Sequence, residues 1–168
     1  VGGGILGLDS NSDNNNFTNN LLNNNIVISD SNSILGGGIL GLSESDSNTF
    51  TNNTLNNNNV TVIGNSDIQG GGIIGIRLNG DNNVFVLNNL RDNTVGVGDD
   101  IYGGGIVGTY FGNNNNFSNT NLIDNNVSAD SDTVDSGVWG LCQNSFGHSI
   151  IDSNLIGNNI SGQGLMGT

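Results

Sequence analysis

The sequence has no proline, one cysteine and only two basic residues beside a single histidine. Because the chain has no proline, every residue keeps its backbone N–H group and can donate a hydrogen bond to a neighbouring strand. Cys142 has no partner within the chain, so we expect either a free thiol or an intermolecular disulfide. The formal net charge of −13 predicts repulsion from nucleic acids and from anionic membrane surfaces. We therefore expect no nucleic-acid partner.

Strong helix formers and long apolar runs are scarce as well. Ala, Glu, Lys and Arg are almost absent, whereas the chain contains 36 Asn and 28 Gly among its 168 residues. No stretch approaches the roughly 18 apolar residues of a membrane-spanning helix, so we expect no membrane insertion. Ile, Val, Phe and Thr dominate the remaining positions, which favours short strands joined by turns.

A glycine-rich block recurs at a fixed period along the whole chain. Gly-Gly-Gly-Ile-Leu-Gly-Leu at 2–8 returns in related form at 36–42, 70–76 and 103–109, and a degraded copy follows at 136–141. Such a period predicts an array of stacked units. We expect residues 1–168 to form a single β-helix domain, with coils at about 2–35, 36–69, 70–102, 103–135 and 136–163 and a sixth coil beginning at 164.

Each repeat carries further anchors in a constant order. A large apolar residue, a leucine, an asparagine and a β-branched residue follow the glycine block at matching positions. The first three sets are Phe17, Phe50, Phe85, Phe117 and Ile150; Leu22, Leu55, Leu90, Leu122 and Leu155; and Asn25, Asn58, Asn93, Asn125 and Asn158. The fourth set is Val27, Val60, Val95, Val127 and Ile160. We expect equivalent residues to stack, including an asparagine ladder at Asn25 and its equivalents.

The anchors predict an all-β parallel β-helix of about five coils, each with three short strands. In the second coil we expect these strands at 37–42, 49–55 and 60–63, with turn residues between them. Equivalent strands of successive coils would pair in parallel at a spacing of roughly 4.8 Å.

The segment 48–58, Asn-Thr-Phe-Thr-Asn-Asn-Thr-Leu-Asn-Asn-Asn, resembles the repeat of right-handed parallel β-helix proteins of the secreted or surface type. That family includes pectate lyases, viral tailspikes and many archaeal and bacterial surface, sheath and adhesin-like proteins. The resemblance covers nearly the whole chain and implies a right-handed coil. It is specific for the fold rather than for the function, because this scaffold hosts many activities.

Strand alternation predicts which face of the glycine block is buried. Leu6, Leu8 and their equivalents share one parity, whereas the other parity continues to Asp9 and Arg77, which belong outside. We therefore expect an exposed apolar face made of Ile5, Ile39, Ile73, Ile106 and Val138. Such a face would pack laterally against another molecule. The alternative is that these residues only raise strand propensity.

Several polar residues are candidates for modification or ligand binding. Asn-x-Ser/Thr sequons predict glycosylation at Asn16, Asn52, Asn59, Asn116, Asn126 and Asn159. The segment Asp9–Asp13 is similar to the start of a calcium loop, but its glycine and terminal glutamate are missing, so we expect solvated turn residues and no cofactor. His148 has no Cys or His partner nearby, and we expect it in a surface turn.

The composition and the repeats, taken with the resemblance to secreted and surface β-helix proteins, lead us to expect a non-enzymatic, extracellular structural protein that forms a surface layer, sheath or filament. Its partner would be a second copy of itself, through end-to-end and lateral packing, since open strand edges are templates for pairing. A fragment of a longer β-helix explains the same ends. The first alternative is an adhesin passenger or stalk that binds glycans or surfaces. The second is a polysaccharide-acting enzyme, which would need clustered carboxylates.

Overall fold

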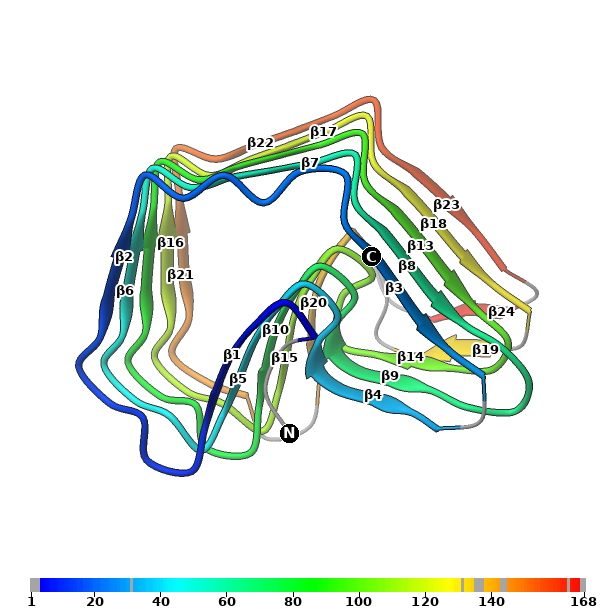
Figure 1. Ribbon diagram of the computed structural model, residues 1–168, viewed down its shortest axis with the longest axis horizontal. Helices are drawn as coiled ribbons and strands as arrows, with labels where there is room; N and C mark the ends of the chain where they lie inside the picture. The colour runs from blue at the N-terminus through cyan, green and yellow to red at the C-terminus, as the bar shows by residue number, and fades with distance from the viewer. Residues whose placement is uncertain are drawn as a thin grey trace.

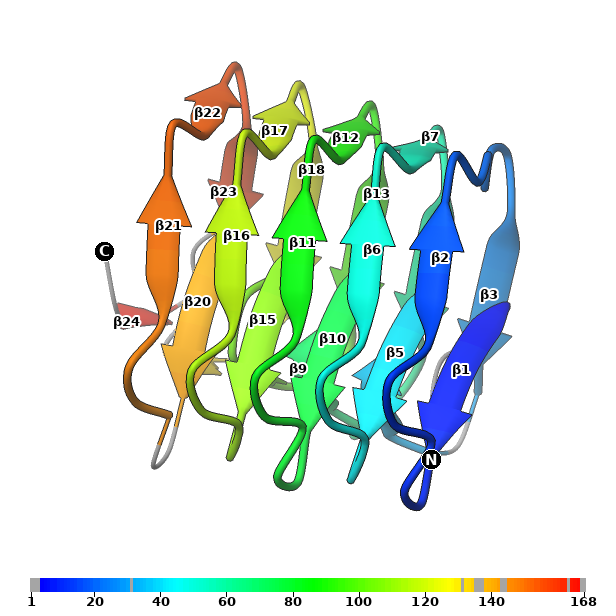
Figure 2. The same ribbon diagram turned by 90° about the vertical axis from the view of Figure 1, so that its left-hand side faces the viewer.

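The computed structural model describes residues 4–30, 32–130, 132–134, 138–142, 145–162 and 164–166. These residues form strands and turns, and they include no helix long and apolar enough to cross a membrane. The strands build a parallel β-solenoid, in which the chain winds around one axis and each turn lies on the previous one (Figures 1 and 2). The predicted fold class is therefore confirmed.

The described strands fall into five parallel sheets, which run along the solenoid axis. We name the sheets A to E in the order in which one turn meets them. Sheet A contains β1 (Leu6–Asp9), β5 (Leu40–Ser43), β10 (Ile74–Arg77), β15 (Val107–Tyr110) and β20 (Trp139–Cys142). Sheet B contains β2 (Asn16–Thr18), β6 (Thr49–Thr51), β11 (Val84–Val86), β16 (Asn116–Ser118) and β21 (Ser149–Ile151). Sheet C contains β7 (Thr54–Asn56), β12 (Asn89–Arg91), β17 (Asn121–Ile123) and β22 (Asn154–Ile156).

Sheets D and E complete each turn and return the chain to sheet A. Sheet D contains β3 (Ile26–Ser29), β8 (Asn59–Val62), β13 (Thr94–Val97), β18 (Asn126–Ala129) and β23 (Asn159–Ser161). Sheet E contains β4 (Ile34–Gly37), β9 (Ile68–Gly71), β14 (Ile101–Tyr102), β19 (Asp132–Val134) and β24 (Gly164–Met166). A complete turn thus has five strands rather than the predicted three, because left-handed residues such as Asn52 and the glycine block each divide an expected strand.

The predicted register is confirmed. Phe50 pairs with Phe17 and Phe85, Leu90 pairs with Leu55 and Leu122, and the valine positions pair in the same way. Successive phenylalanine rings stack nearly in parallel, with centroids 4.7 to 5.0 Å apart. These rings and the leucine and valine columns fill the core. Seen from the N-terminal end, the chain runs clockwise from β1 through β2 and β3 to β4 and recedes with each turn, so the coil is right-handed (Figures 1 and 2).

The cross-section is indented where sheet E meets sheet A. Between β4 and β5 the chain turns inward and back again, and the tip of this bend points into the interior (Figure 1). We call residues 36–41, 70–75 and 103–108 the glycine corner. Gly70 has a φ of 99°, which favours glycine, and a Cβ atom on Gly75 would overlap the carbonyl oxygen of Gly36. Neighbouring turns of the glycine corner therefore approach each other here through backbone atoms alone.

The glycine corner overturns the predicted exposed face. Ile39, Ile73 and Ile106 are 0% exposed and Val138 is 6% exposed, whereas Ile5 is 48% exposed in the first turn. The prediction was wrong because it extended strand alternation through the whole block. Ile39 instead lies at the tip of the bend, between β4 and β5, where the alternation is interrupted. The other parity was assigned correctly, since Leu40 and Leu42 are also buried.

Candidate functional site

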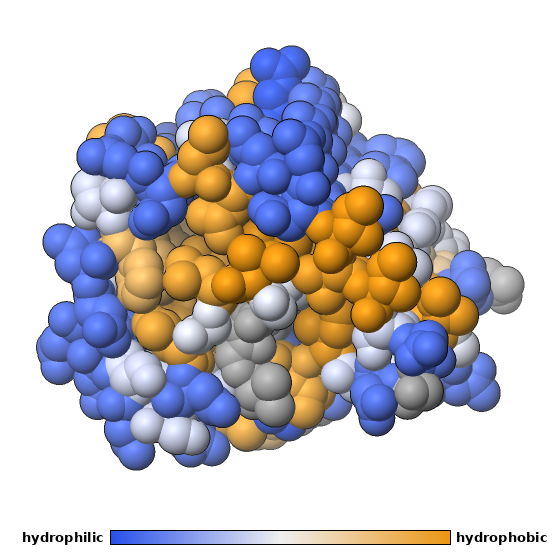
Figure 3. Space-filling view, viewed as in Figure 1, coloured by the Kyte–Doolittle hydropathy of each residue, from blue (hydrophilic) through white to orange (hydrophobic). Residues whose placement is uncertain are grey.

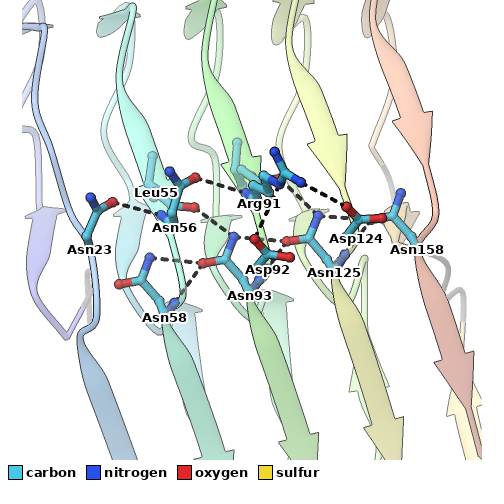
Figure 4. A network of polar contacts seen from close by, with 11 residues as sticks. Asn23, Leu55, Asn56, Asn58, Arg91, Asp92, Asn93, Asp124, Asn125 and Asn158 are labelled. Carbon is cyan, nitrogen blue, oxygen red and sulfur yellow. Dashed lines mark hydrogen bonds and ion pairs between the residues drawn. The ribbon is translucent and has the colours of Figure 1, made fainter.

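The asparagine ladder predicted at Asn25 and its equivalents lies at the corner between sheets C and D. The backbone N–H and the Nδ2 group of Asn58 both donate to Asn93 Oδ1, each at 3.0 Å, and Asn93 donates in the same way to Asn125. The Nδ2 group of Asn93 also donates backward to the Leu55 carbonyl at 2.7 Å. Figure 4 shows this column running from turn to turn. Each asparagine of the middle turns thus bonds both neighbouring turns.

Two further columns of the same kind were not predicted. One lies before sheet B and the other between sheets B and C; they contain Asn15, Asn48, Asn83 and Asn115, and Asn20, Asn53 and Asn88. All three columns have one direction, since each turn donates to the Oδ1 atom of the turn that follows it. The buried amides, such as Asn83 at 0% exposure, are satisfied by these bonds.

A left-handed residue precedes the column asparagine at each corner. Asn14, Asn19 and Asn24 have φ values of 57° to 59°, and the equivalent positions of the next turns are also left-handed. Asparagine tolerates this conformation better than other side chains do, apart from glycine. Leu87 is an exception, with a φ of 59° and a side chain that is 53% exposed.

The last two turns replace asparagine in two of the columns. Thr120 and Ser153 follow Asn88, and the Thr120 N–H donates to Ser153 Oγ at 3.1 Å. His148 follows Asn115 and lies in a half-buried position rather than in the expected surface turn. Its Nε2 atom lies 3.0 Å from the Gly112 carbonyl oxygen, the contact that Asn115 Nδ2 makes with Gly80 one turn earlier. Burial lowers the pKa of His148, and hydrogen bonding to the backbone of Gly112 and Asn115 opposes this shift.

Asp13, in the segment considered as a calcium loop, accepts a backbone hydrogen bond, and its equivalents in the next two turns do the same. Asp13 Oδ1 accepts the Asp46 N–H at 2.7 Å, Asp46 Oδ1 accepts the Asp81 N–H, and Asp81 Oδ1 accepts the Asn113 N–H. Elsewhere, ligand atoms of Asp67, Asp99 and Asp100 lie within 4.8 Å of one another. Burial raises the pKa of Asp67; the Asp100 backbone hydrogen bond lowers it, and the Asp99 charge raises it further. We assign no cation to this acidic cluster.

The sequon asparagines face outward, as glycosylation requires. Asn16, Asn52 and Asn159 are exposed, and the other three, Asn59, Asn116 and Asn126, are half-buried. Neighbouring turns link some of them, because Asn159 Nδ2 donates to Asn126 Oδ1 at 2.8 Å. Glycosylation itself stays a prediction. The side chain of Cys142 lies outside the described part of the structure, so the predicted intermolecular disulfide also stays a prediction.

The N-terminal end of the solenoid presents an apolar surface. Figure 3 looks onto this end and shows apolar residues gathered over its middle, with polar residues around much of the rim. We call it the head face; it contains Ile5, Leu6, Leu8, Phe17, Val27 and Ile34. All belong to the core columns or to the glycine block, and no described residue covers them from outside. The same columns end at the other side of the solenoid.

The C-terminal turn exposes the matching members of these columns. Ile150, in the phenylalanine column, is 48% exposed, and Leu155, in the leucine column, is 51% exposed. Ile160 continues the valine column and is partly buried. We call these three residues and the exposed edges of β21, β22 and β23 the tail face. Head and tail therefore carry the two ends of the same core columns.

The structure also brings three aromatic residues together on the outside of the glycine corner. The rings of Tyr102 and Tyr110 lie 6.2 Å apart, and Phe111 meets Tyr110 edge-on at 4.7 Å. One turn earlier, Arg77 Nε donates to Gln69 Oε1 at 3.1 Å across the same corner. Trp139, in the next turn, packs edge-on against Phe117.

Comparison with protein-family models, with curated proteins and with solved structures gave no match for this chain.

Proposed function

We propose that this chain is a non-enzymatic structural protein, whose solenoid stacks end to end with further copies into rods. The rods would form an extracellular surface layer, sheath or filament. The observation that carries the proposal is the exposure of the core columns on both end faces. Ile5, Ile150 and Leu155 are about half exposed, whereas their equivalents in the middle turns, Ile39, Phe85 and Leu90, are 0% exposed.

Burial of the end faces supplies the driving force. Covering apolar side chains stabilises an interface in proportion to the apolar area removed from water, and a parallel strand edge offers hydrogen bonds to the same partner. Lateral packing through the isoleucine column has no part in the proposal, because every member of that column after Ile5 is buried within one chain. The net charge of −13 opposes association at low ionic strength, so salt should promote it.

Sedimentation velocity and electron microscopy of the purified chain over a range of concentrations test this function. We expect particles of constant width whose length grows in whole multiples of the monomer, and we expect longer particles at higher salt. The Leu155→Lys variant should remain monomeric, because it places a charge on the tail face. Leu87→Lys is the matched control, since Leu87 is equally exposed but lies on the outer surface. A wild-type chain that stays monomeric at every concentration would refute the proposal.

The aromatic residues on the glycine corner favour a second candidate, the binding of glycans by an adhesin stalk. Aromatic faces beside an arginine and amide or carboxylate groups are suited to sugar rings and their hydroxyl groups. Tyr110→Ala should then abolish retention on immobilised oligosaccharides, whereas Tyr110→Phe should keep most of it. Equal retention of wild type and Tyr110→Ala would exclude this site.

A further inference from the structure

We infer that the rods are polar: the tail face of one copy docks on the head face of the next, and the three asparagine columns continue across the junction. This inference rests on the proposed end-to-end assembly and adds its direction and register. It follows from the hydrogen-bonding groups that each end face presents.

The head face presents acceptors. Asn15, Asn20 and Asn25 donate to the second turn, but their own Oδ1 atoms accept no bond from another turn among the described residues. In every later turn that carries asparagine at these positions, the equivalent Oδ1 atom accepts from the turn before it. Asn58 Oδ1, for example, accepts both the N–H and the Nδ2 group of Asn25.

The tail face presents donors in the same three columns. Asn158 Nδ2 donates backward to the Leu122 carbonyl at 2.8 Å, as Asn93 Nδ2 does to Leu55. Asn93 uses its N–H and a second Nδ2 contact for Asn125, whereas those donors of Asn158 have no acceptor among the described residues. In the other two columns, the backbone N–H groups of His148 and Ser153 are the equivalents of the Asn158 N–H group.

Backbone groups complement these columns in the opposite sense. Inside the chain, the N–H groups of Asn59, Asn126 and Asn159 donate to the carbonyl groups of Asn25, Asn93 and Asn125. Ile26 is the first-turn equivalent of Asn59, so its N–H would donate to the Asn158 carbonyl of a docked copy. At the same junction Ile150 would pack on Phe17, as it packs against Phe117 within the chain.

Other orientations lack this match. Two head faces would leave the Oδ1 atoms of the columns without the asparagine donors that they meet between turns of one chain, and two tail faces would leave the column N–H donors without Oδ1 acceptors. Buried polar groups without partners cost free energy, so the head-to-tail junction is preferred. The preference also fixes the register, because three columns and the ring stack have to align together.

Two matched variants test the direction. Phe17→Lys blocks the head face and Ile150→Lys blocks the tail face, at opposite ends of one column. We expect each variant alone to be monomeric by sedimentation velocity, whereas an equimolar mixture forms a one-to-one dimer and nothing longer. Association of either variant with itself would overturn the inference, as would a mixture that stays monomeric while the wild type assembles.

The same experiment separates this inference from the proposed function. If wild type fails to associate, end-to-end assembly is wrong; if wild type associates but the pairing rule fails, only the polarity is wrong. Circular dichroism checks that each variant is folded. Should Phe17→Lys not fold, Val27→Lys and Ile160→Lys provide a second pair at the two ends of the valine column.

Discussion

Gly38 lies directly against Val60, so that a Cβ atom added to the glycine would come within 2.6 and 2.7 Å of the two valine methyl carbons. The same added atom would meet the Gly72 carbonyl oxygen of the next turn. Gly72 and Gly105 repeat this contact with Val95 and Val127. The third glycine of each block thus allows the glycine corner to pack closely against sheet D.

Replacing Gly38 with alanine should therefore destabilise the protein by about 2–3 kcal/mol, as overpacking does in other cores. Urea unfolding followed by circular dichroism measures the loss. Gly96→Ala is the matched control, because an added Cβ there meets only Ser128 Oγ, at 3.5 Å. Equal effects of the two substitutions would contradict the packing described for the corner.

Replacing Leu87 with asparagine should stabilise the protein by about 1 kcal/mol, because the left-handed conformation disfavours a leucine. The side chain is 53% exposed, so little packing is lost. Thermal unfolding checks the gain. Leu21→Asn serves as a control, since Leu21 is 69% exposed and does not have a positive φ. A gain of the same size at Leu21 would show that the effect is not conformational.

Replacing Thr120 with asparagine should repair the interrupted column and add about 1 kcal/mol of stability. The new Oδ1 would accept the Asn88 N–H, and the new Nδ2 would donate to the Phe85 carbonyl, as Asn88 Nδ2 donates to Phe50. The reverse change, Asn88→Thr, should reduce stability by removing the acceptor for Asn53. Urea midpoints that move in the same direction for both variants would disprove this account.

Replacing His148 with asparagine should remove a pH dependence of stability. Since the folded pKa of His148 lies below its ordinary value of 6.5, the unfolded chain binds the proton more readily. The stability that neutral His148 contributes is fully present above the ordinary pKa. It is lost as the pH falls below the ordinary pKa toward the folded pKa. We expect the difference in urea midpoint between His148→Asn and wild type to widen between pH 7.5 and pH 5.5, a window about one unit either side of the ordinary value. A difference in urea midpoint that stays constant over this pH range would show that His148 is not the source of the pH dependence.

Replacing Thr109 with valine should stabilise the core by about 1–2 kcal/mol. Thr109 is 0% exposed, it lies in a column with Leu42 and Ile76, and its Oγ1 atom has no hydrogen-bond partner among the described residues. A buried hydroxyl without a partner costs free energy, and valine keeps the shape. Thr61→Val is the control, because Thr61 Oγ1 donates to Asn59 Oδ1. A loss of stability at position 109 would mean that the hydroxyl is satisfied.

Repetition made the register predictable. Apolar residues recur at the positions of Phe50, Leu55 and Val60 in every turn, and stacking of equivalent residues is the simplest arrangement that buries them all. The two further asparagine columns could be recognised in the same way, since Asn48 and Asn53 lie at fixed sequence offsets from Phe50. They were missed because Thr120, Ser153 and His148 interrupt them, whereas the column at Asn58 is complete.

The glycine corner could not be predicted from alternation. That rule assumes an extended strand, and nothing local to Ile39 shows that its backbone reverses there. The reversal depends on contacts far away in the sequence, such as Gly38 with Val60 and Gly75 with Gly36. The number of strands was underestimated for a related reason, because Asn52 was placed within a strand although it adopts a left-handed turn conformation.

The similarity of the glycine blocks in the first three turns has a consequence for folding. Leu6, Gly7 and Leu8 pair with Leu40, Gly41 and Leu42, and the third turn offers β5 an almost equivalent partner. A nascent chain that skips one turn would lose little pairing energy, so misaligned intermediates compete with the native order. Residues that differ from their equivalents in other turns, such as Trp139 and His148, make individual turns distinct and disfavour such a misalignment.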